Sequence, residues 1–320
     1  MGLSKQKRVK IFGVPIDLGS EPLGVEMGPE AIRHAGLHQA LEYNNIEYLD
    51  YGNLEVDREN THNGSVQQIS ALSEHLAELV CGAIQDGYIP MILGGDHSAA
   101  IGSIAGTSKT SERLGLLWLD CHPDANTPKT SPSGNIHGMT VAISLGYGYP
   151  QLVNCAKFKP KVLPQDICIL GAKDIDKSEQ DFIKAMGINM FTLFDIEKYG
   201  IVQVFDEAIK IISKHTDRIH VSFDVDVLDP VIAPGTGITS RGGLTYREIS
   251  YLMEMLGRLD IVGALDIIEI NPLLDFRNQT SELVVELALS VLGGCYGDYH
   301  RTYLSHNVPN HKIQSPGPPQ

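Results

Sequence analysis

The chain has 320 residues, of which 42% are hydrophobic, and its formal net charge at pH 7 is −14. A chain of this length and composition can bury a large core. The negative charge argues against a surface that follows nucleic-acid phosphates, and no apolar run approaches the length of a membrane helix. We therefore expect neither nucleic acid nor a membrane among its partners.

Two features of the sequence predict a cytoplasmic protein. The basic start, residues 1–8, runs straight into a strand-like stretch without the apolar segment of a signal peptide. The five cysteines are scattered without a C-x-x-C pair, which is typical of reduced intracellular thiols rather than of a disulfide framework.

Apolar runs that alternate with helical stretches predict eight strands. In chain order these strands lie near residues 8–14, 46–51, 88–93, 115–120, 167–171, 189–192, 218–224 and 261–267. A long helix is predicted over residues 66–86, and Pro90 is compatible with the next strand only near its start. The alternation predicts an α/β fold with three αβα layers and a mostly parallel central sheet. In such sheets, ligands bind beyond the carboxyl ends of the strands.

We find no internal repeat and no convincing linker. Residues 1–304 are therefore predicted to form a single domain. Residues 305–320 are rich in proline and polar residues and are expected to form a flexible tail.

Three polar segments each follow an apolar run and together offer a ligand set for two metal ions. They are residues 94–98 (GGDHS), 120–124 (DCHPD) and 224–226 (DVD). Because residues two apart at a strand end project to the same side, Asp120, His122 and Asp124 should converge, as should Asp224 and Asp226. Two ions about 3.5 to 4 Å apart can hold a bridging water as hydroxide at neutral pH. The segments therefore predict metal-assisted hydrolysis.

The metal is expected to be manganese, because oxygen-rich sites with imidazole and no thiolate suit a hard or borderline ion better than structural zinc does. A lone Asp-x-Asp is more often a turn or a helix cap. Burying so many carboxylates without cations would be very costly, however, and the joint occurrence of the three segments favours metal binding. Cys121 is expected to be a small residue on the other side of the strand rather than a thiolate ligand.

At these segments the chain resembles the ureohydrolase family, and within it the arginases. The resemblance also includes residues 13–19, 24–29, 133–139, 242–248 and 266–272. It implies an arginase-like fold with two Mn²⁺ per subunit, Co²⁺ or Ni²⁺ being possible replacements, and a homo-oligomer, either a trimer or a hexamer. By this resemblance the first ion would be held by His97, Asp120, Asp124 and Asp224, and the second by Asp120, His122, Asp224 and Asp226. Asp120 and Asp224 would bridge the ions.

The resemblance also assigns roles around a guanidino substrate. His137 follows a turn-prone loop and would be the proton shuttle, a role that suits an imidazole near neutral pH. Glu269 would pair with the guanidinium through two charge-assisted hydrogen bonds and so position its central carbon. Asp124 would help the metals to stabilise the tetrahedral intermediate.

Recognition of an amino-acid group separates the arginases from their relatives. The resemblance assigns the α-carboxylate to Asn126, Ser131 and Ser133 on one loop and the α-amino group to Asp176, and it includes Asn135 of the same loop among the substrate-binding residues. Agmatinases, whose substrate lacks the carboxylate, do not usually carry this loop. Asp176 is also a candidate N-cap for a helix over residues 178–186, and both roles could coexist.

We therefore predict hydrolysis of L-arginine to L-ornithine and urea by attack of a metal-bridging hydroxide. Three residues depart from the usual pattern: Ile238 stands where a threonine is typical, Pro123 separates His122 from Asp124, and Val227 follows Asp226. The alternatives are another guanidino acid or an agmatine-like compound as substrate, and a catalytically silent binding subunit. A silent homologue is expected to lose metal ligands, whereas all six are present.

Overall fold

The computed structural model describes residues 7–20, 23–56 and 64–294. The predicted tail, residues 305–320, lies outside the described residues. Within the described residues, no helix is both long enough and apolar enough to cross a membrane.

Eight strands form one sheet in the order β2-β1-β3-β8-β7-β4-β5-β6, and every paired strand runs parallel to its neighbour. The strands are β1 (Arg8–Val14), β2 (Glu47–Asn53), β3 (Ile89–Gly94), β4 (Gly115–Leu119), β5 (Ile167–Ala172), β6 (Asn189–Thr192), β7 (Ile219–Asp224) and β8 (Val262–Ile268). All eight predicted strands are therefore present, and the predicted parallel sheet is confirmed.

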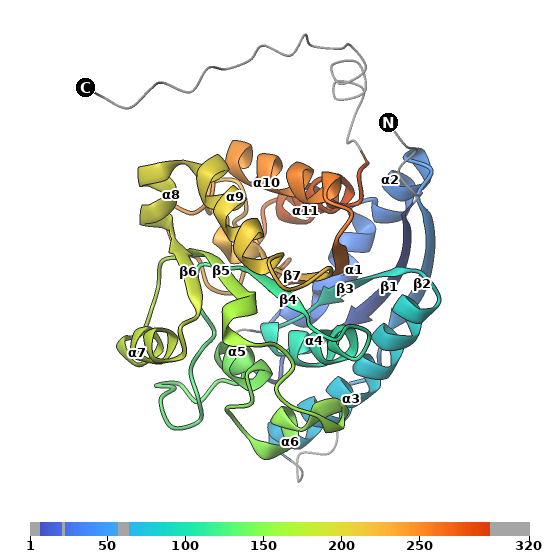
Figure 1. Cartoon of the computed structure of the whole chain (residues 1–320). Coiled ribbons are helices and arrows are strands. Elements are labelled where there is room, and N and C mark those ends of the chain that lie inside the picture. The colour runs from blue at the N-terminus through green and yellow to red at the C-terminus, as the bar shows by residue number, and fades with distance from the viewer. Residues whose placement is uncertain (1–6, 21–22, 57–63, 295–320) are drawn as a thin grey trace, which may run out of the picture.

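Helices cover both faces of the sheet (Figure 1). One layer holds α1 (Gly28–His34), α2 (Leu37–Tyr43), α8 (Leu193–Tyr199), α9 (Ile201–Ile212), α10 (Tyr246–Arg258) and α11 (Gln279–Val291). The other holds α3 (Gly64–Gln85), α4 (Ala100–Ser108), α5 (Thr140–Ser144), α6 (Pro150–Val153) and α7 (Lys177–Met186). Short 3₁₀ turns are η1 (Val25–Met27), η3 (His97–Ala99), η4 (His137–Met139), η5 (Cys155–Lys157), η6 (Pro164–Asp166) and η7 (Val225–Val227). The predicted three-layer αβα fold is confirmed.

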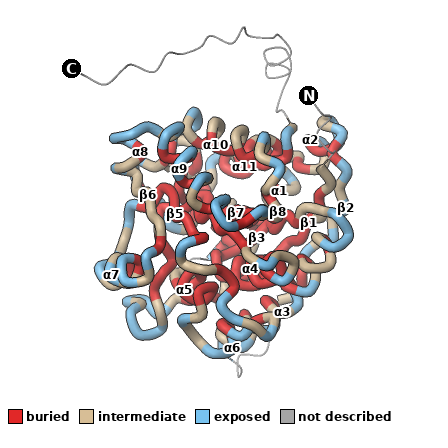
Figure 2. Tube along the Cα trace, in the orientation of Figure 1, coloured by how far each residue is buried: buried red, intermediate tan, exposed pale blue. Residues whose placement is uncertain are grey.

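The central strands are buried on both faces (Figure 2). Such strands have nearly continuous apolar sequences because helices cover both sides of a parallel sheet. β2 lies at an edge, and its residues alternate between exposed and half-buried. Pro90 is the second residue of β3, where only β1 is paired, since pairing with β8 begins at Met91. The proline therefore sits where β8 requires no hydrogen bond from it.

The strand order determines where the polar segments meet. β3, β8, β7 and β4 are neighbours in the sheet, and their carboxyl ends lead into residues 94–98, 269, 224–226 and 120–124. Segments far apart in the sequence therefore reach one edge of the sheet, where α/β folds bind their ligands.

Candidate metal centre and active site

Two short caps fix the backbone at the ends of β3 and β7. Asp96 caps η3 by accepting a hydrogen bond from the backbone N of Ser98 at 2.9 Å. Asp224 caps η7 by accepting one from the backbone N of Asp226 at 2.8 Å. The Asp-x-Asp segment is thus a turn cap as well as a candidate metal ligand, because Asp224 uses Oδ1 for the cap and directs Oδ2 toward His97.

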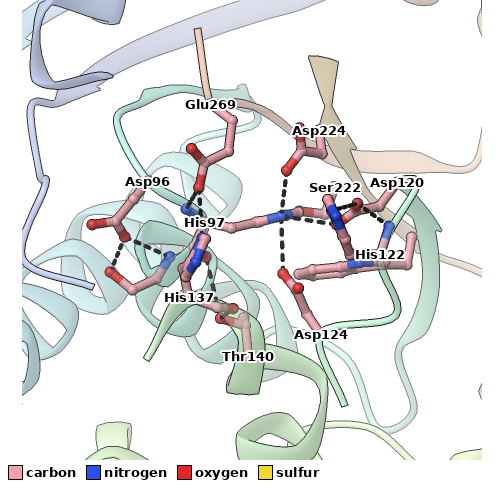
Figure 3. A network of polar contacts seen from close by, with 12 residues as sticks. Asp96, His97, Asp120, His122, Asp124, His137, Thr140, Ser222, Asp224 and Glu269 are labelled. Carbon is pink, nitrogen blue, oxygen red and sulfur yellow. Dashed lines mark hydrogen bonds and ion pairs between the residues drawn. The ribbon is translucent and has the colours of Figure 1, made fainter. Parts of the chain in front are cut away.

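The first cluster of predicted ligands surrounds Nδ1 of His97 (Figure 3). This atom lies 3.2 Å from Asp120 Oδ2, 3.3 Å from Asp124 Oδ2 and 3.1 Å from Asp224 Oδ2. It is buried and has no hydrogen-bond partner among the described residues. An unpartnered ring nitrogen that faces three carboxylate oxygens fits a divalent cation held among them.

The His97 ring is held from its other side. Its Nε2 lies 2.9 Å from Ser222 Oγ, and Ser222 in turn donates to Asp266 Oδ2 at 3.2 Å. Because the Ser222 hydroxyl donates to Asp266, its Oγ can accept a hydrogen bond from Nε2–H of His97, and in that tautomer the lone pair of Nδ1 is directed at the metal site. The ring also stacks on Trp118 with 3.9 Å between centroids, and the indole of Trp118 donates to Asp120 Oδ2 at 3.0 Å.

The second cluster surrounds Nδ1 of His122, which lies 3.1 Å from Asp226 Oδ2 and 3.4 Å from Asp120 Oδ1. Asp120 therefore directs one oxygen toward each histidine. The two clusters share this carboxylate, which agrees with the bridging position that the resemblance implies for it. Asp224 is the other predicted bridge. Its Oδ1 accepts a hydrogen bond from the backbone N of Asp226, a residue of this cluster, whereas its Oδ2 is directed at the first cluster.

Cys121 does not lie where the sequence predicts. Its Sγ is 3.4 Å from His122 Nδ1 rather than on the opposite side of the strand. The expectation is wrong because β4 ends at Leu119, so strand alternation no longer applies to the residues that follow. Burial raises the pKa of the Cys121 thiol far above its usual range, and the nearby His122 only partly opposes this.

The electrostatics of the two clusters favour bound cations. Burial lowers the pKa of His97 and of His122, but the neighbouring carboxylates outweigh it and raise both pKa values above the usual range. Burial, followed by repulsion from other carboxylates, raises the pKa values of Asp124 and Asp224. The four aspartates of the two clusters outnumber the two histidines, so ionising all four leaves an excess of negative charge that divalent cations would balance.

Two residues of the site adopt a left-handed backbone, with φ of 48° at Asp124 and 67° at Glu269. Residues other than glycine rarely adopt this conformation, and it concentrates at functional sites. At Glu269 it follows the end of β8 at Ile268, and the backbone N of Glu269 donates to Gly95 O at 2.8 Å.

His137 and Glu269 form a pair beside the first cluster (Figure 3). His137 Nδ1 lies 3.0 Å from Glu269 Oε1, and the same oxygen accepts a hydrogen bond from the backbone N of His97 at 2.8 Å. Burial lowers the pKa of His137, but the hydrogen bond to Glu269 and the surrounding carboxylates outweigh it and raise the pKa to about 9. A histidine in this position can carry a proton at neutral pH.

One pocket of about 440 Å³ joins the clusters to the predicted substrate residues. Its volume is within the range of small-molecule sites. The lining includes metal-cluster residues His122, Asp124, Asp224 and Asp226, the pair His137 and Glu269, and Asn126, Ser131, Ser133, Asn135, Asp176 and Ile238. His97 and Asp120 are fully buried beneath it.

The loop that is predicted to bind the α-carboxylate of the substrate is hydrogen-bonded to the start of α7. Asn126 Nδ2 donates to Asp176 Oδ2 at 3.0 Å. Asp176 caps α7 in a capping box with Glu179, so the predicted cap is confirmed while the residue also lines the pocket. Ser131 Oγ accepts from Gly134 N at 2.9 Å, and Ser133 Oγ accepts from Asn135 N at 3.2 Å. Both hydroxyls keep their protons available for a ligand.

Sequence reasoning missed several buried residues that orient the site. They are Asp96, Trp118, Glu179, Ser222 and Asp266. Glu179 accepts from the backbone N of Ala125 at 3.0 Å and so holds the segment after Asp124. Asp266 lies within the 266–272 motif, but its partners His220 and Ser103, at 2.8 and 2.7 Å, come from another strand and a helix. Only the folded chain reveals these contacts.

Comparison with known proteins agrees with this architecture. The model of the Arginase family matches residues 7–293. The arginase of Bacillus caldovelox is 41% identical over 294 residues, which is 90% of this chain and 98% of that protein. The arginase of Brevibacillus brevis is 44% identical over 292 residues, with the same coverage. The crystal structure of arginase from Bacillus cereus has a TM-score of 0.86 at 42% identity and covers 91% of this chain and 100% of that one. The chain therefore belongs to the arginase family of amidinohydrolase enzymes.

Proposed function

We propose that this protein hydrolyses L-arginine to L-ornithine and urea with two manganese ions. The observation that carries the proposal is a single pocket. Its lining combines His122 and three carboxylates of the metal clusters, the pair of His137 and Glu269, and the polar loop that holds Ser131 and Ser133. The curated relatives described above are named arginases.

The six predicted ligands divide between the two clusters. His97, Asp124 and Asp224 would hold one cation, and His122 and Asp226 would hold the other, with Asp120 directed at both. When bound, such a cation pair supplies an activated water at neutral pH and positive charge near the reacting carbon. Because all six ligands are present, we favour an enzyme over a silent binding subunit.

The chain's own residues would handle the substrate and the proton. Glu269 Oε1 contacts His137 Nδ1 and the backbone N of His97. Its other oxygen, Oε2, would accept a hydrogen bond from a guanidinium. A carboxylate beside a guanidinium positions it through charge-assisted hydrogen bonds. His137 holds a proton at Nδ1 or Nε2 and would transfer it to the leaving amine nitrogen.

The amino-acid end of the substrate would lie at the loop. The hydroxyls of Ser131 and Ser133, together with Asn126 and Asn135, offer donors for the α-carboxylate, and Asp176 offers an acceptor for the α-amino group. Hydrogen bonds to charged groups typically contribute about 1.5 to 3 kcal/mol each. This loop would therefore decide between arginine and analogues that lack the carboxylate.

Removal of metal should abolish urea release, because every proposed route to an activated water depends on the two clusters. We expect chelated, dialysed protein to be inactive and to recover on addition of Mn²⁺. The measurement is urea formation together with metal content by elemental analysis. Full turnover in rigorously metal-free protein would contradict the proposal.

L-Arginine should exceed agmatine in kcat/KM by well over tenfold. Losing contacts to one charged group costs about 1.5 to 3 kcal/mol, which corresponds to a factor of roughly 10 to 150. The measurement is urea release from a panel of guanidino compounds by the manganese-loaded protein. Equal or faster turnover of agmatine would show that the loop does not bind an α-carboxylate.

Another guanidino acid as substrate is the second candidate, and Ile238 is the observation that favours it. This side chain lines the pocket and is 42% exposed, so a branched apolar surface is presented where a hydroxyl is typical of the arginases that the chain resembles. A substrate with a bulkier or less polar group at this position would fit it better than arginine.

The Ile238→Thr variant separates the two candidates. If arginine is the natural substrate, we expect kcat/KM for arginine to rise by the equivalent of about 0.5 to 1.5 kcal/mol, the net value of one hydrogen bond. If a bulkier guanidino acid is the substrate, its turnover should fall while that of arginine stays flat or rises. A loss of arginine activity would contradict this account of Ile238.

A further inference from the structure

The thiol of Cys121 differs from the other buried thiols of the described chain. Cys155 and Cys168 belong to hydrophobic clusters of the core. Cys121 is equally buried, but its Sγ lies against the imidazole of His122, 3.4 Å from Nδ1 and 3.7 Å from Nε2. The cysteine is therefore placed beside polar ligand atoms instead of apolar side chains.

The backbone holds Cys121 firmly in this position. Its carbonyl oxygen accepts from the backbone N of Lys173 at 2.8 Å and of Asp174 at 3.0 Å, just after β5. Its backbone N lies 3.4 Å from Asp226 Oδ1. These contacts link the cysteine both to the neighbouring strand and to a carboxylate of the second cluster, so the direction of its Cβ is constrained.

The atoms around Cys121 have the spacing of ligands that share one cation. One ligand atom each from Cys121, His122, Asp120 and Asp226 lies within 4.8 Å of all the others. His122 Nδ1 is 3.1 Å from Asp226 Oδ2, 3.4 Å from Asp120 Oδ1 and 3.4 Å from the sulfur. A cation about 2.0 to 2.3 Å from each of four tetrahedral ligands separates those ligands by roughly 3.3 to 3.8 Å. Two of the three observed separations lie in that range, and the third, from His122 Nδ1 to Asp226 Oδ2, is 0.2 Å shorter.

We propose that Cys121 Sγ is an additional ligand of the second cluster, so that this cluster, although it accepts the Mn²⁺ of the proposed function, binds a borderline cation such as Co²⁺ or Zn²⁺ more tightly. Thiolate ligands favour such ions, whereas carboxylates alone suit manganese. The ligand is the thiolate, so binding releases the thiol proton to solvent. The first cluster offers imidazole and carboxylates and keeps its preference for manganese. This inference rests on the proposed metal centre but not on the proposed substrate.

Cobalt gives a direct optical test of a sulfur ligand. Chelated full-length protein is titrated with Co²⁺, and the near-ultraviolet thiolate-to-cobalt charge-transfer band is recorded against bound metal. We expect the band to saturate after only one of the two ions has bound. It should disappear in Cys121→Ala and persist in Cys168→Ala, a matched buried cysteine outside the site. Two bound Co²⁺ without a band, or a band that persists in Cys121→Ala, would overturn the proposal.

Metal affinity provides the second readout and uses a more conservative variant. In competition with a chromophoric chelator, Cys121→Ser should bind the Co²⁺ of the second cluster at least about tenfold less tightly, while Mn²⁺ affinity changes much less. Equal losses for both metals would indicate a general disturbance of the site and overturn the proposed preference. If wild-type protein binds neither metal, the metal centre itself is refuted. If it binds both ions without the band, only the sulfur ligand is refuted.

Discussion

Asp120→Asn should remove both cations and reduce kcat/KM for the guanidino substrate by at least about a thousandfold, which is about 4 kcal/mol of transition-state stabilisation. Asp120 is the carboxylate that reaches both histidines, with Oδ2 at 3.2 Å from His97 Nδ1 and Oδ1 at 3.4 Å from His122 Nδ1. An amide at this position keeps the shape but removes the negative charge from both clusters at once. The measurement is metal content per chain by elemental analysis, paired with urea release.

Two variants serve as controls for that result. Asp166 is also fully buried, but it pairs with Arg113 at 2.6 and 2.9 Å, away from the site. Asp166→Asn should lower stability and leave both cations bound. His97→Asn should lose one cation preferentially, since His97 itself belongs to the first cluster only. If Asp120→Asn retained two cations per chain, its bridging position would be wrong.

The strands could be predicted because this sheet is covered on both faces. β4, β5 and β7 are buried at every residue, and a strand that is buried on both sides requires an unbroken apolar run. The edge strand β2 is exposed at alternate residues, and the strand predicted near residues 46–51 nevertheless corresponds to it.

The convergence of the site could not be derived from spacing alone. Glu269 and the backbone N of His97 are separated by 172 residues, and the 2.8 Å contact between them depends on β3 and β8 being neighbours. Strand order is a property of the whole packing arrangement, and no local pattern encodes it. The family resemblance, rather than periodicity, supplied the expectation that these residues meet.

The contacts of residues beyond a strand end also could not be predicted from the sequence. The alternation rule placed Cys121 on the wrong side because it assumed that β4 continues past Leu119. The partners of His97, namely Ser222 Oγ at 2.9 Å and the ring of Trp118 at 3.9 Å, lie inside apolar runs. A serine or a tryptophan in such a run predicts packing, and nothing in the sequence indicates which histidine it will contact.

Glu269→Gln should reduce kcat/KM by roughly a thousandfold, about 4 kcal/mol, for two separable reasons. The carboxylate would lose its charge-assisted hydrogen bonds to a guanidinium, and charged hydrogen bonds contribute about 1.5 to 3 kcal/mol. It would also lose its charge beside His137 Nδ1, which lies 3.0 Å from Oε1. The first effect weakens substrate positioning at every pH. The second changes the pH range in which His137 carries its proton.

The pH profile distinguishes these two effects. Glu269 contributes to a pKa of about 9 for His137 by opposing the effect of burial. A raised pKa keeps the ring protonated to higher pH, so activity that needs the acid form should fall as pH rises through the His137 pKa. Without the carboxylate that pKa moves down, and the alkaline limb of the residual activity should move to lower pH. The same shift should appear when the imidazole is titrated by NMR.

A Glu269→Gln enzyme with low activity but an unmoved alkaline limb would restrict Glu269 to substrate positioning. The proton on His137 would then be held by the other carboxylates of the pocket.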